Sequence, residues 1–250
     1  MIKVMLSGCN GKMGTVISKL ALNDSEVEIV AGVDINTTKN FNYEVFENPS
    51  EFKGKADVII DFSHPSVFEK IIGYSVESKT PVVVATTGLS DEQRETLKTV
   101  ATKTAVFFSA NMSIGVNLLM ELVKQAAKVL EENFDIEIIE KHHNQKIDAP
   151  SGTALALADA INEAVESKKE YIYDRHSVRK KRARSEMGIH SLRGGSIVGE
   201  HQVIFAGCDE VIELKHTATS KEIFGVGALS AAKFMAGKES GYYSMKDMIN

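Results

Sequence analysis

Short apolar runs alternate with amphipathic segments through the first part of the chain. The apolar and β-branched runs have the length of single strands, and they fall at residues 2–7, 27–34, 57–62, 81–86 and 105–109. Between the first two runs, one helical face is marked by Met13, Val16, Ile17 and Leu20. Ser90 and Gln93 have the form of a capping box that opens a further helix. This alternation predicts a parallel sheet with crossover helices.

The pattern changes after residue 111. A long apolar helix is expected over 113–130, then a strand over 134–143 and a helix after Pro150-Ser151. Residues 196–205 and 210–217 are predicted to be consecutive strands joined at 207–209, which favours a helix-covered antiparallel sheet. The fold class is therefore α/β, with an N-terminal Rossmann-like doubly wound sheet and a second α+β domain. The expected divisions are 1–111, 112–217 and 218–250, and a helix over 224–235 is expected to return to the first domain.

Composition and charge narrow the class of protein. The 250 residues are 43% hydrophobic and 25% charged, as in an ordinary globular protein. No apolar run is long enough to span a bilayer and the start of the chain does not resemble a leader, so a cytoplasmic protein is expected. The net charge of −5 gives no general attraction to nucleic acid or to membranes. Cys9 and Cys208 are interpreted as reduced thiols.

One local exception is the basic segment, residues 175–184. It contains Arg175, Arg179, Lys180, Lys181, Arg182 and Arg184 without interleaved aromatic residues. We interpret it as a solvated loop or an anion-attracting rim, and contact with nucleic acid is the less favoured alternative.

A glycine-rich loop directly follows the first predicted strand and opens the first helix. It consists of Gly8, Cys9, Asn10, Gly11, Lys12, Met13 and Gly14, with GxxGxxG spacing. Asp34 ends the second predicted strand twenty residues after Gly14, where a carboxylate can accept hydrogen bonds from a ribose. Together they favour dinucleotide binding over glycines and an aspartate that serve only to form turns. Because the carboxylate repels a 2′-phosphate, and because Ile35 follows it, we expect NADH to be preferred, while Lys12 or Lys39 could allow NADPH.

A second group of polar residues follows the strand predicted at 134–143. His142 and His143 are adjacent and should face opposite sides of the strand, so they are not expected to bind one metal. Lys146 offers a cation, and the helix that begins at 151–153 offers backbone N–H groups. One interpretation is a pocket for a small anion beside a proton donor. The other is a buried histidine, a surface histidine and a helix cap, and the residues alone leave both open.

The run from Glu140 to Ala154, EKHHNQKIDAPSGTA, resembles the signature of the dihydrodipicolinate reductase family, now called 4-hydroxy-tetrahydrodipicolinate reductase. The resemblance covers essentially the whole chain. It includes the glycine-rich loop and the segments at 61–63, 85–88, 109–113, 193–195 and 198–201. The chain departs from the family at Lys12 and Ile35, where arginine is often found, and at Ala85, which is commonly glycine.

The resemblance implies reduction of 4-hydroxy-tetrahydrodipicolinate to tetrahydrodipicolinate, with NADH or NADPH, in diaminopimelate and lysine biosynthesis. It implies a dinucleotide-binding domain at 1–111, a substrate-binding and oligomerisation domain at 112–217 and a homotetramer. By family analogy, His142 exchanges a proton and Lys146 is a second proton donor. The substrate-binding residues would be His143, Gly152 and Thr153. The nicotinamide side of the cofactor would be lined by Ala85, Thr86, Thr87, Ser109, Ala110, Asn111 and Met112.

Three further interpretations are kept. Arg193, flanked by glycine, is a candidate second clamp for a substrate carboxylate. A different small carboxylic acid as substrate would not need the His142, His143 and Lys146 group. An NADH-binding sensor that contacts nucleic acid through the basic segment would bind cofactor without turnover. Since the cofactor loop and the His142 group lie in different predicted domains, domain closure is expected.

Overall fold

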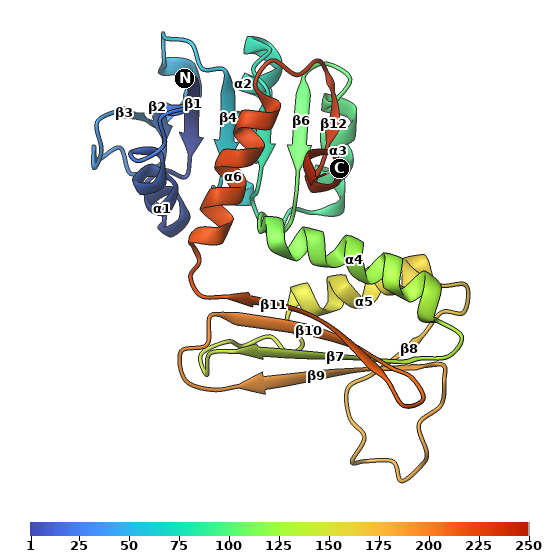
Figure 1. Cartoon of the computed structure of the whole chain (residues 1–250). Coiled ribbons are helices and arrows are strands. Elements are labelled where there is room, and N and C mark those ends of the chain that lie inside the picture. Colours follow the sequence, from blue (N-terminus) through green and yellow to red (C-terminus); the bar gives the residue numbers. More distant parts are fainter. Residues whose placement is uncertain (250) are drawn as a thin grey trace. The chain divides into compact units, whose positions relative to one another are not determined.

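The computed structural model describes residues 1–249 and consists of two compact units (Figure 1). One unit contains Met1–Ile114 together with the chain from Glu222 onward, and the other contains Gly115–Lys221. The sequence places these divisions after residues 111 and 217. None of the helices over 1–249 has both the length and the apolar character needed to cross a membrane.

The first unit is built on a parallel sheet with the strand order β12-β6-β5-β4-β1-β2-β3. The five predicted strands are confirmed: β1 (Ile2–Ser7) has the expected bounds, and β2 (Val27–Val33), β4 (Val58–Asp61), β5 (Val82–Val84) and β6 (Ala105–Phe108) are slightly shorter than expected. The edge strands β3 (Glu44–Phe46) and β12 (Gly241–Tyr243) were not predicted. Three residues are too few to show a period.

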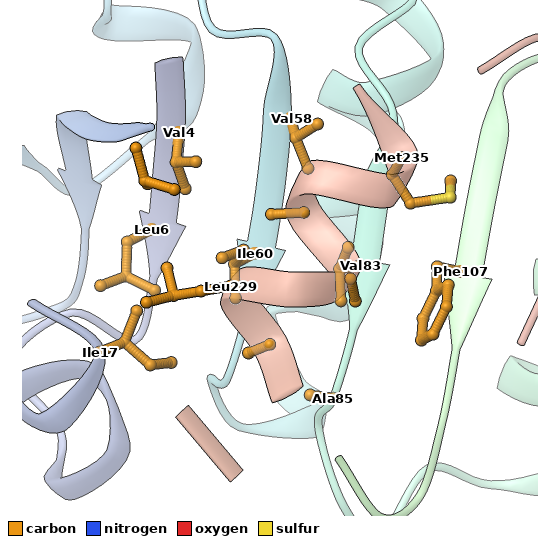
Figure 2. Packing of buried hydrophobic residues seen from close by; sticks show 14 of the residues in the cluster. Val4, Leu6, Ile17, Val58, Ile60, Val83, Ala85, Phe107, Leu229 and Met235 are labelled. Atoms are coloured by element: carbon orange, nitrogen blue, oxygen red, sulfur yellow. The ribbon is translucent and has the colours of Figure 1, made fainter. Parts of the chain in front are cut away.

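Helices cover both faces of this sheet. They are α1 (Lys12–Ala21), α2 (Phe68–Ser78), α3 (Asp91–Val100), α6 (Glu222–Met235) and the short α7 (Met245–Ile249), with 3-10 turns at Pro49–Glu51 and Pro65–Val67. Figure 2 shows Leu229 and Met235 of α6 packed over Ile60, Val83 and Phe107 of the sheet. In the structure α6 packs on the sheet of the first unit, and Ser90 and Gln93 form the expected capping box.

The opposite face of the same sheet packs against α2 and α3. Met5 and Ile59 pack on that face. Their sequence neighbours Val4 and Ile60 pack on the face that α6 covers. Strands that are buried on both faces must be apolar at every position, which explains the continuous hydrophobic runs of the sequence.

The second unit contains a sheet with the order β11-β10-β7-β9-β8. Its strands are β7 (Asp135–His142), β8 (Glu170–Ile172), β9 (Glu186–Arg193), β10 (Gly199–Ala206) and β11 (Val211–Ala218). The hairpin of β10 and β11 is antiparallel as predicted, but β9 is parallel to both β7 and β8. The sheet is therefore mixed, and the expectation of an antiparallel sheet was wrong. Between β7 and β9 the chain crosses over through α5 (Gly152–Ala164), and a crossover returns the next strand in parallel.

Two helices, α4 (Ile114–Leu130) and α5, cover one face of the second sheet. On β7 every second residue is buried, and the buried positions are Ile136, Ile138, Glu140 and His142. The strand thus begins with aliphatic side chains on the covered face and ends with two ionisable ones.

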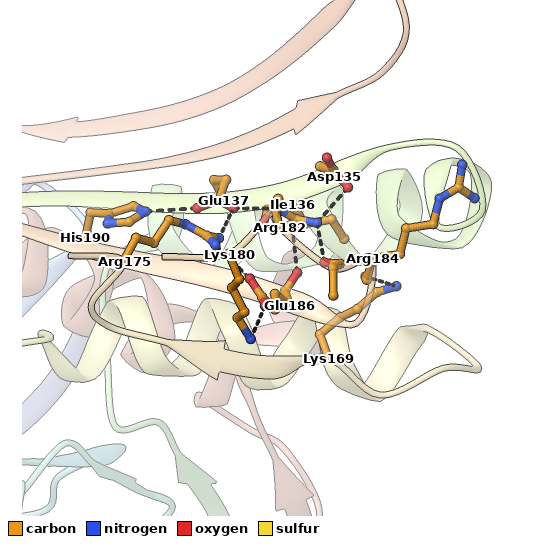
Figure 3. Close-up of polar contacts among 11 residues, drawn as sticks. Asp135, Ile136, Glu137, Lys169, Arg175, Lys180, Arg182, Arg184, Glu186 and His190 are labelled. Carbon is orange, nitrogen blue, oxygen red and sulfur yellow. Dashed lines mark hydrogen bonds and ion pairs between the residues drawn. The ribbon is translucent and has the colours of Figure 1, made fainter. Parts of the chain in front are cut away.

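Most residues of the basic segment are exposed, but two of its arginines are tied to this sheet. Arg182 donates hydrogen bonds to Asp135 Oδ1 (2.6 Å) and Glu137 Oε1 (2.8 Å), while Arg175 pairs with Glu137 and Glu186 (Figure 3). Glu186 is only 1% exposed. Arg175, Lys180 and Arg182 are paired with carboxylates of this unit, whereas Arg179 and Lys181 are exposed, as expected of a solvated loop.

Candidate functional site

The glycine-rich loop of the first unit makes a turn that only glycine permits at two positions. Gly8 has a φ of +75°, and a Cβ there would lie 2.6 Å from the carbonyl oxygen of Phe62. A Cβ on Gly14 would lie 2.1 Å from the carbonyl oxygen of Gly8. Gly11 is exposed and is the N-cap of α1, with no side-chain cap. The loop therefore leaves the backbone N–H groups at the start of α1 open to an anionic ligand.

Asp34 immediately follows β2, and its carboxylate is held by the backbone. Oδ2 accepts a hydrogen bond from the Asn10 N–H and Oδ1 from the Asn36 N–H, both at 3.0 Å. The Asn10 side chain donates to the carbonyl oxygens of Asn36 (2.6 Å) and Thr38 (2.9 Å), and Asn40 donates to its Oδ1. Asn10 thus joins the glycine-rich loop to the segment after Asp34, a role that only the tertiary structure reveals.

A cleft of about 620 Å³ lies beside this loop. Its walls include Ser7, Gly8, Gly11, Asp34 and Thr87. This volume is in the usual range for small-molecule sites. Ser7 lines this cleft, and within residues 1–249 its buried Oγ has no hydrogen-bond partner. A glycine turn, a fixed carboxylate and an unsatisfied hydroxyl fit one nucleotide half of a dinucleotide cofactor.

The cations around Asp34 differ from the expectation. Lys39 forms an exposed ion pair with Glu44. Lys12 is exposed on the first turn of α1. Lys70 of α2, which the sequence interpretation missed, lines the same cleft as Asp34. No local motif marks Lys70, because α2 reaches the cleft only through the crossover.

The other predicted cofactor residues belong to the ends of β5 and β6. Ala85 and Thr86 are buried, the Ala85 N–H donates to the Asp61 carbonyl oxygen, and Thr86 Oγ1 donates to Asp61 Oδ2 (2.8 Å). Thr87 is exposed and lines the cleft. Buried Asp61, at the end of β4, therefore holds the loop that presents Thr87.

In the remaining predicted cofactor positions, several side chains face inward. Cys9 is completely buried, and burial raises the pKa of its thiol to about 12, so only its backbone can meet a ligand. Met112 is 3% exposed. Met13, Ser109 and Asn111 are half-buried. Ala110 is exposed.

In the second unit, His142 is the last residue of β7 and is 9% exposed. Its Nδ1 lies 2.6 Å from Oε2 of Glu140, which is fully buried. Arg193, at the end of the neighbouring strand β9, donates to both oxygens of that carboxylate, at 2.8 Å and 2.7 Å. His142 and Arg193 are opposite each other in the strand register.

Arg193 is not a free clamp for substrate. Its two terminal nitrogens also donate to the carbonyl oxygens of Leu192 (2.7 Å) and Asp148 (2.8 Å). All four terminal N–H groups of the guanidinium then have acceptors within the protein. The interpretation of Arg193 as a second carboxylate clamp was therefore wrong, because the sequence could not show its buried partner.

The other predicted substrate residues lie after the end of β7 and at the start of α5. Lys146 follows β7, is 21% exposed at its side chain and forms an ion pair with Asp148 (2.8 Å). His143 and Thr153 are half-buried, and Gly152 is exposed as the first residue of α5. A Cβ on Gly152 would meet no atom within 4 Å. Open space beside cationic and N–H groups suits an anionic substrate.

Two further histidines, His201 and His216, stand opposite each other on β10 and β11. His201 is 5% exposed, and Ser151 Oγ lies 3.0 Å from its Nε2. Burial, followed by the nearby His142, lowers the pKa of His201 to about 4, and burial also lowers the pKa of His216. Both therefore have the positions of structural residues within paired strands. Over residues 1–249, no cluster of His, Cys, Asp and Glu could hold a metal ion.

Comparison with known proteins points in one direction. The model described as "Dihydrodipicolinate reductase, N-terminus" matches residues 2–112, and "Dihydrodipicolinate reductase, C-terminus" matches residues 115–249. Proteins named 4-hydroxy-tetrahydrodipicolinate reductase from Caldanaerobacter subterraneus subsp. tengcongensis and Clostridium tetani are each 52% identical to this chain. Each alignment covers 100% of this chain and 98% of the relative.

A solved structure of dipicolinate-bound dihydrodipicolinate reductase from Paenisporosarcina sp. TG-14 is similar over 100% of both chains, with a TM-score of 0.85 and 27% identity. The resemblance first seen in the motif of residues 140–154 thus extends over the complete sequence and fold. This chain belongs to the dihydrodipicolinate reductase family, whose members are NAD(P)H-dependent oxidoreductases.

Proposed function

We propose that this protein reduces 4-hydroxy-tetrahydrodipicolinate to tetrahydrodipicolinate with NADH or NADPH, as a step of diaminopimelate and lysine biosynthesis. The observation that carries the proposal is the His142 group: a histidine with one shielded ring nitrogen, beside Lys146 and the start of α5. The full-length match to relatives named 4-hydroxy-tetrahydrodipicolinate reductase supports this reaction.

The cofactor belongs to the first unit in this proposal. Gly8, Gly11 and the start of α1 would hold the pyrophosphate, and the Asp34 carboxylate would accept hydrogen bonds from the ribose. The loops at 85–87 and 109–112 would line the nicotinamide side, with Ala85, Thr86, Ser109, Asn111 and Met112 contributing mainly backbone atoms. When bound, the reduced nicotinamide supplies the hydride.

NADH is the preferred cofactor in this proposal. The Asp34 carboxylate would repel a 2′-phosphate, and Glu44 competes with a phosphate for the cation of Lys39. Lys70 at the cleft allows NADPH to be used less efficiently. The ratio of kcat/KM for the two cofactors measures this preference.

The substrate belongs to the second unit. Its carboxylates would be held by Lys146, by His143 and by backbone N–H groups at Gly152 and Thr153. His142 would exchange the proton through Nε2, since Nδ1 is engaged by Glu140. The dipicolinate bound to the Paenisporosarcina relative is a small planar dicarboxylate, which supports a site of this kind.

The reaction is tested by following the absorbance of NADH and, separately, NADPH. The substrate is made in the cuvette by condensing pyruvate with aspartate semialdehyde, and a mixture without the semialdehyde is the control. Oxidation that depends on the condensation product is expected. If NADH binds but is not oxidised, the proposed substrate is wrong.

The role of His142 is tested in the same assay with His142→Gln. We expect kcat to fall by about 10²- to 10⁴-fold because general acid catalysis is lost. The affinity for cofactor, measured by fluorescence titration, should not change. An unchanged kcat would contradict the assignment.

We also propose a homotetramer in the cytoplasm. The second sheet has helices on one face, and the apolar side chains of Leu192, Val211 and Ile212 on β9 and β11 are 47%, 58% and 38% exposed. Such side chains suit burial against another copy. Light scattering coupled to size exclusion is expected to give a mass near four times 27.3 kDa, and a monomer mass would contradict the proposal.

A further inference from the structure

Glu140 lies directly behind His142 on β7. Because one residue separates them, both side chains project to the covered face of the sheet. Glu140 has no exposed surface, and its carboxylate is 2.6 Å from His142 Nδ1. A buried carboxylate is costly unless it is paired, so its position beside the histidine needs a physical explanation.

The carboxylate of Glu140 is saturated with donors from three elements. Oε1 accepts from Arg193 (2.7 Å) and from the Ser151 N–H (3.1 Å), and Oε2 accepts from Arg193 (2.8 Å) and His142. Burial alone would raise the pKa of Glu140, but these hydrogen bonds, led by Arg193, lower it to about 2. Glu140 therefore stays ionised and cannot rotate away without losing several bonds at once.

We infer that Glu140, held by Arg193, is a positioning residue that fixes the tautomer of His142 and leaves Nε2 as the only ring nitrogen that exchanges a proton with substrate. The inference rests on the function proposed above. In the neutral ring the carboxylate accepts the Nδ1 hydrogen, so the lone pair is on Nε2. In the protonated ring Nδ1 keeps the same bond, and Nε2–H becomes the donor.

The surroundings of Nε2 agree with this arrangement. Gly199, the first residue of β10, lies beside it, and a Cβ there would be 3.1 Å from Nε2. The neighbouring ring of His201 stands edge-on, with centroids 5.1 Å apart, and its low pKa keeps it neutral at neutral pH. The charged partners at Nδ1 of His142 are the carboxylate of Glu140 and, behind it, the guanidinium of Arg193, while the positive charge of Lys146 acts on the adjacent ring of His201.

The first test is Glu140→Gln in the full-length enzyme. A glutamine that keeps its oxygen on Arg193 and Ser151 turns its NH₂ toward His142 Nδ1, so the ring must carry its hydrogen on Nε2. We expect kcat to fall by about 10²- to 10⁴-fold, as when the orienting carboxylate of a catalytic histidine becomes an amide, and KM to change much less. The alkaline limb of the kcat profile should move to lower pH, because the protonated ring loses its counter-ion.

The matched control is Glu186→Gln. Glu186 is also a buried carboxylate of this sheet, 1% exposed, but its side-chain ion pairs are with Arg175 (2.7 Å) and Lys180 (2.9 Å) and not with a histidine. Both substitutions should lower the thermal midpoint, and only Glu140→Gln should lower kcat and shift the pH profile. If the two variants have the same kcat, Glu140 is merely a structural ion-pair partner and the inference is overturned.

The second test does not depend on catalysis. Histidine ¹⁵N–¹H correlation spectra of the full-length protein at alkaline pH report which ring nitrogen carries hydrogen, and His142→Gln identifies the signal of His142. We expect Nδ1–H in the unsubstituted protein and Nε2–H in Glu140→Gln. Nε2–H in the unsubstituted protein overturns the inference, whatever the enzyme reduces. Nδ1–H without turnover of the condensation product supports the tautomer assignment and overturns the proposed function instead.

Discussion

Arg182 is expected to contribute about 2–4 kcal/mol to the stability of the second unit, which Arg182→Ala would remove. The side chain is 18% exposed, and its donors reach Asp135, Glu137 and the carbonyl oxygens of Ile136 (3.1 Å) and Glu186 (2.6 Å) (Figure 3). Glu137 keeps Arg175 after the change, and Asp135 is 46% exposed, so water can replace that bond. Most of the loss therefore comes from the two carbonyl oxygens, at about 1–2 kcal/mol each for a charged donor.

Thermal unfolding measures this loss. At about 2–4 °C per kcal/mol for a chain of this size, the midpoint should fall by about 5–15 °C. The matched control is Arg179→Ala, which removes the same charge from an exposed position in the same segment and should change stability by less than about 0.5 kcal/mol. Equal midpoints for the two variants would refute the conclusion that internal hydrogen bonds hold the basic segment.

Three further predictions concern the loop, the cofactor and pH. Gly14→Ala places a Cβ 2.1 Å from the Gly8 carbonyl oxygen, so NADH affinity by fluorescence titration should fall by about tenfold or more, whereas Gly73→Ala, with open space around its Cβ, should bind normally. Asp34→Asn removes the charge that repels a 2′-phosphate, so the NADPH to NADH ratio of kcat/KM should rise by about 5- to 30-fold, and an unchanged ratio would contradict the role of Asp34. Burial is the main cause that lowers the pKa of His201 from 6.5 to about 4 in the folded protein. Because the unfolded chain then binds the proton more readily, the free energy of unfolding measured in urea should fall by up to about 3 kcal/mol as the pH drops from about 6.5 to about 4. His201→Gln should flatten this pH dependence, and an equally steep profile in the variant would show that other groups cause it.

Local features of the fold could be predicted because their signals are contained in short stretches of chain. The five central strands of the first sheet, the capping box at Ser90 and the hairpin of β10 and β11 all appear at nearly the expected positions. The strands β3, β8, β9 and β12 were missed. Three of them have only three residues, and β9 mixes glycine, histidine and serine with apolar residues, so it has no clean period.

The candidate site divides in the same way. The motif of residues 140–154 identifies His142 and Lys146 by type and spacing, but it cannot show which nitrogen of His142 is shielded. A signal for Glu140 did exist, because period-two alternation puts it on the buried face with His142. Its meaning depends on Arg193, which is 53 residues away in sequence and reaches it only through the pairing of β7 with β9.

By itself, the sequence determined the class of fold, the glycine turn, the family and the residue types of the site, since each depends on periodicity or on a contiguous motif. The tertiary structure alone decided how the charges are used. Arg193 is the counter-ion of Glu140, Lys39 pairs with Glu44, and Arg175, Lys180 and Arg182 of the basic segment pair with acidic residues of β7 and β9. The physical reason is that an ionic side chain acts according to the partner within a few ångströms of it, and strand pairing over long sequence separations selects that partner.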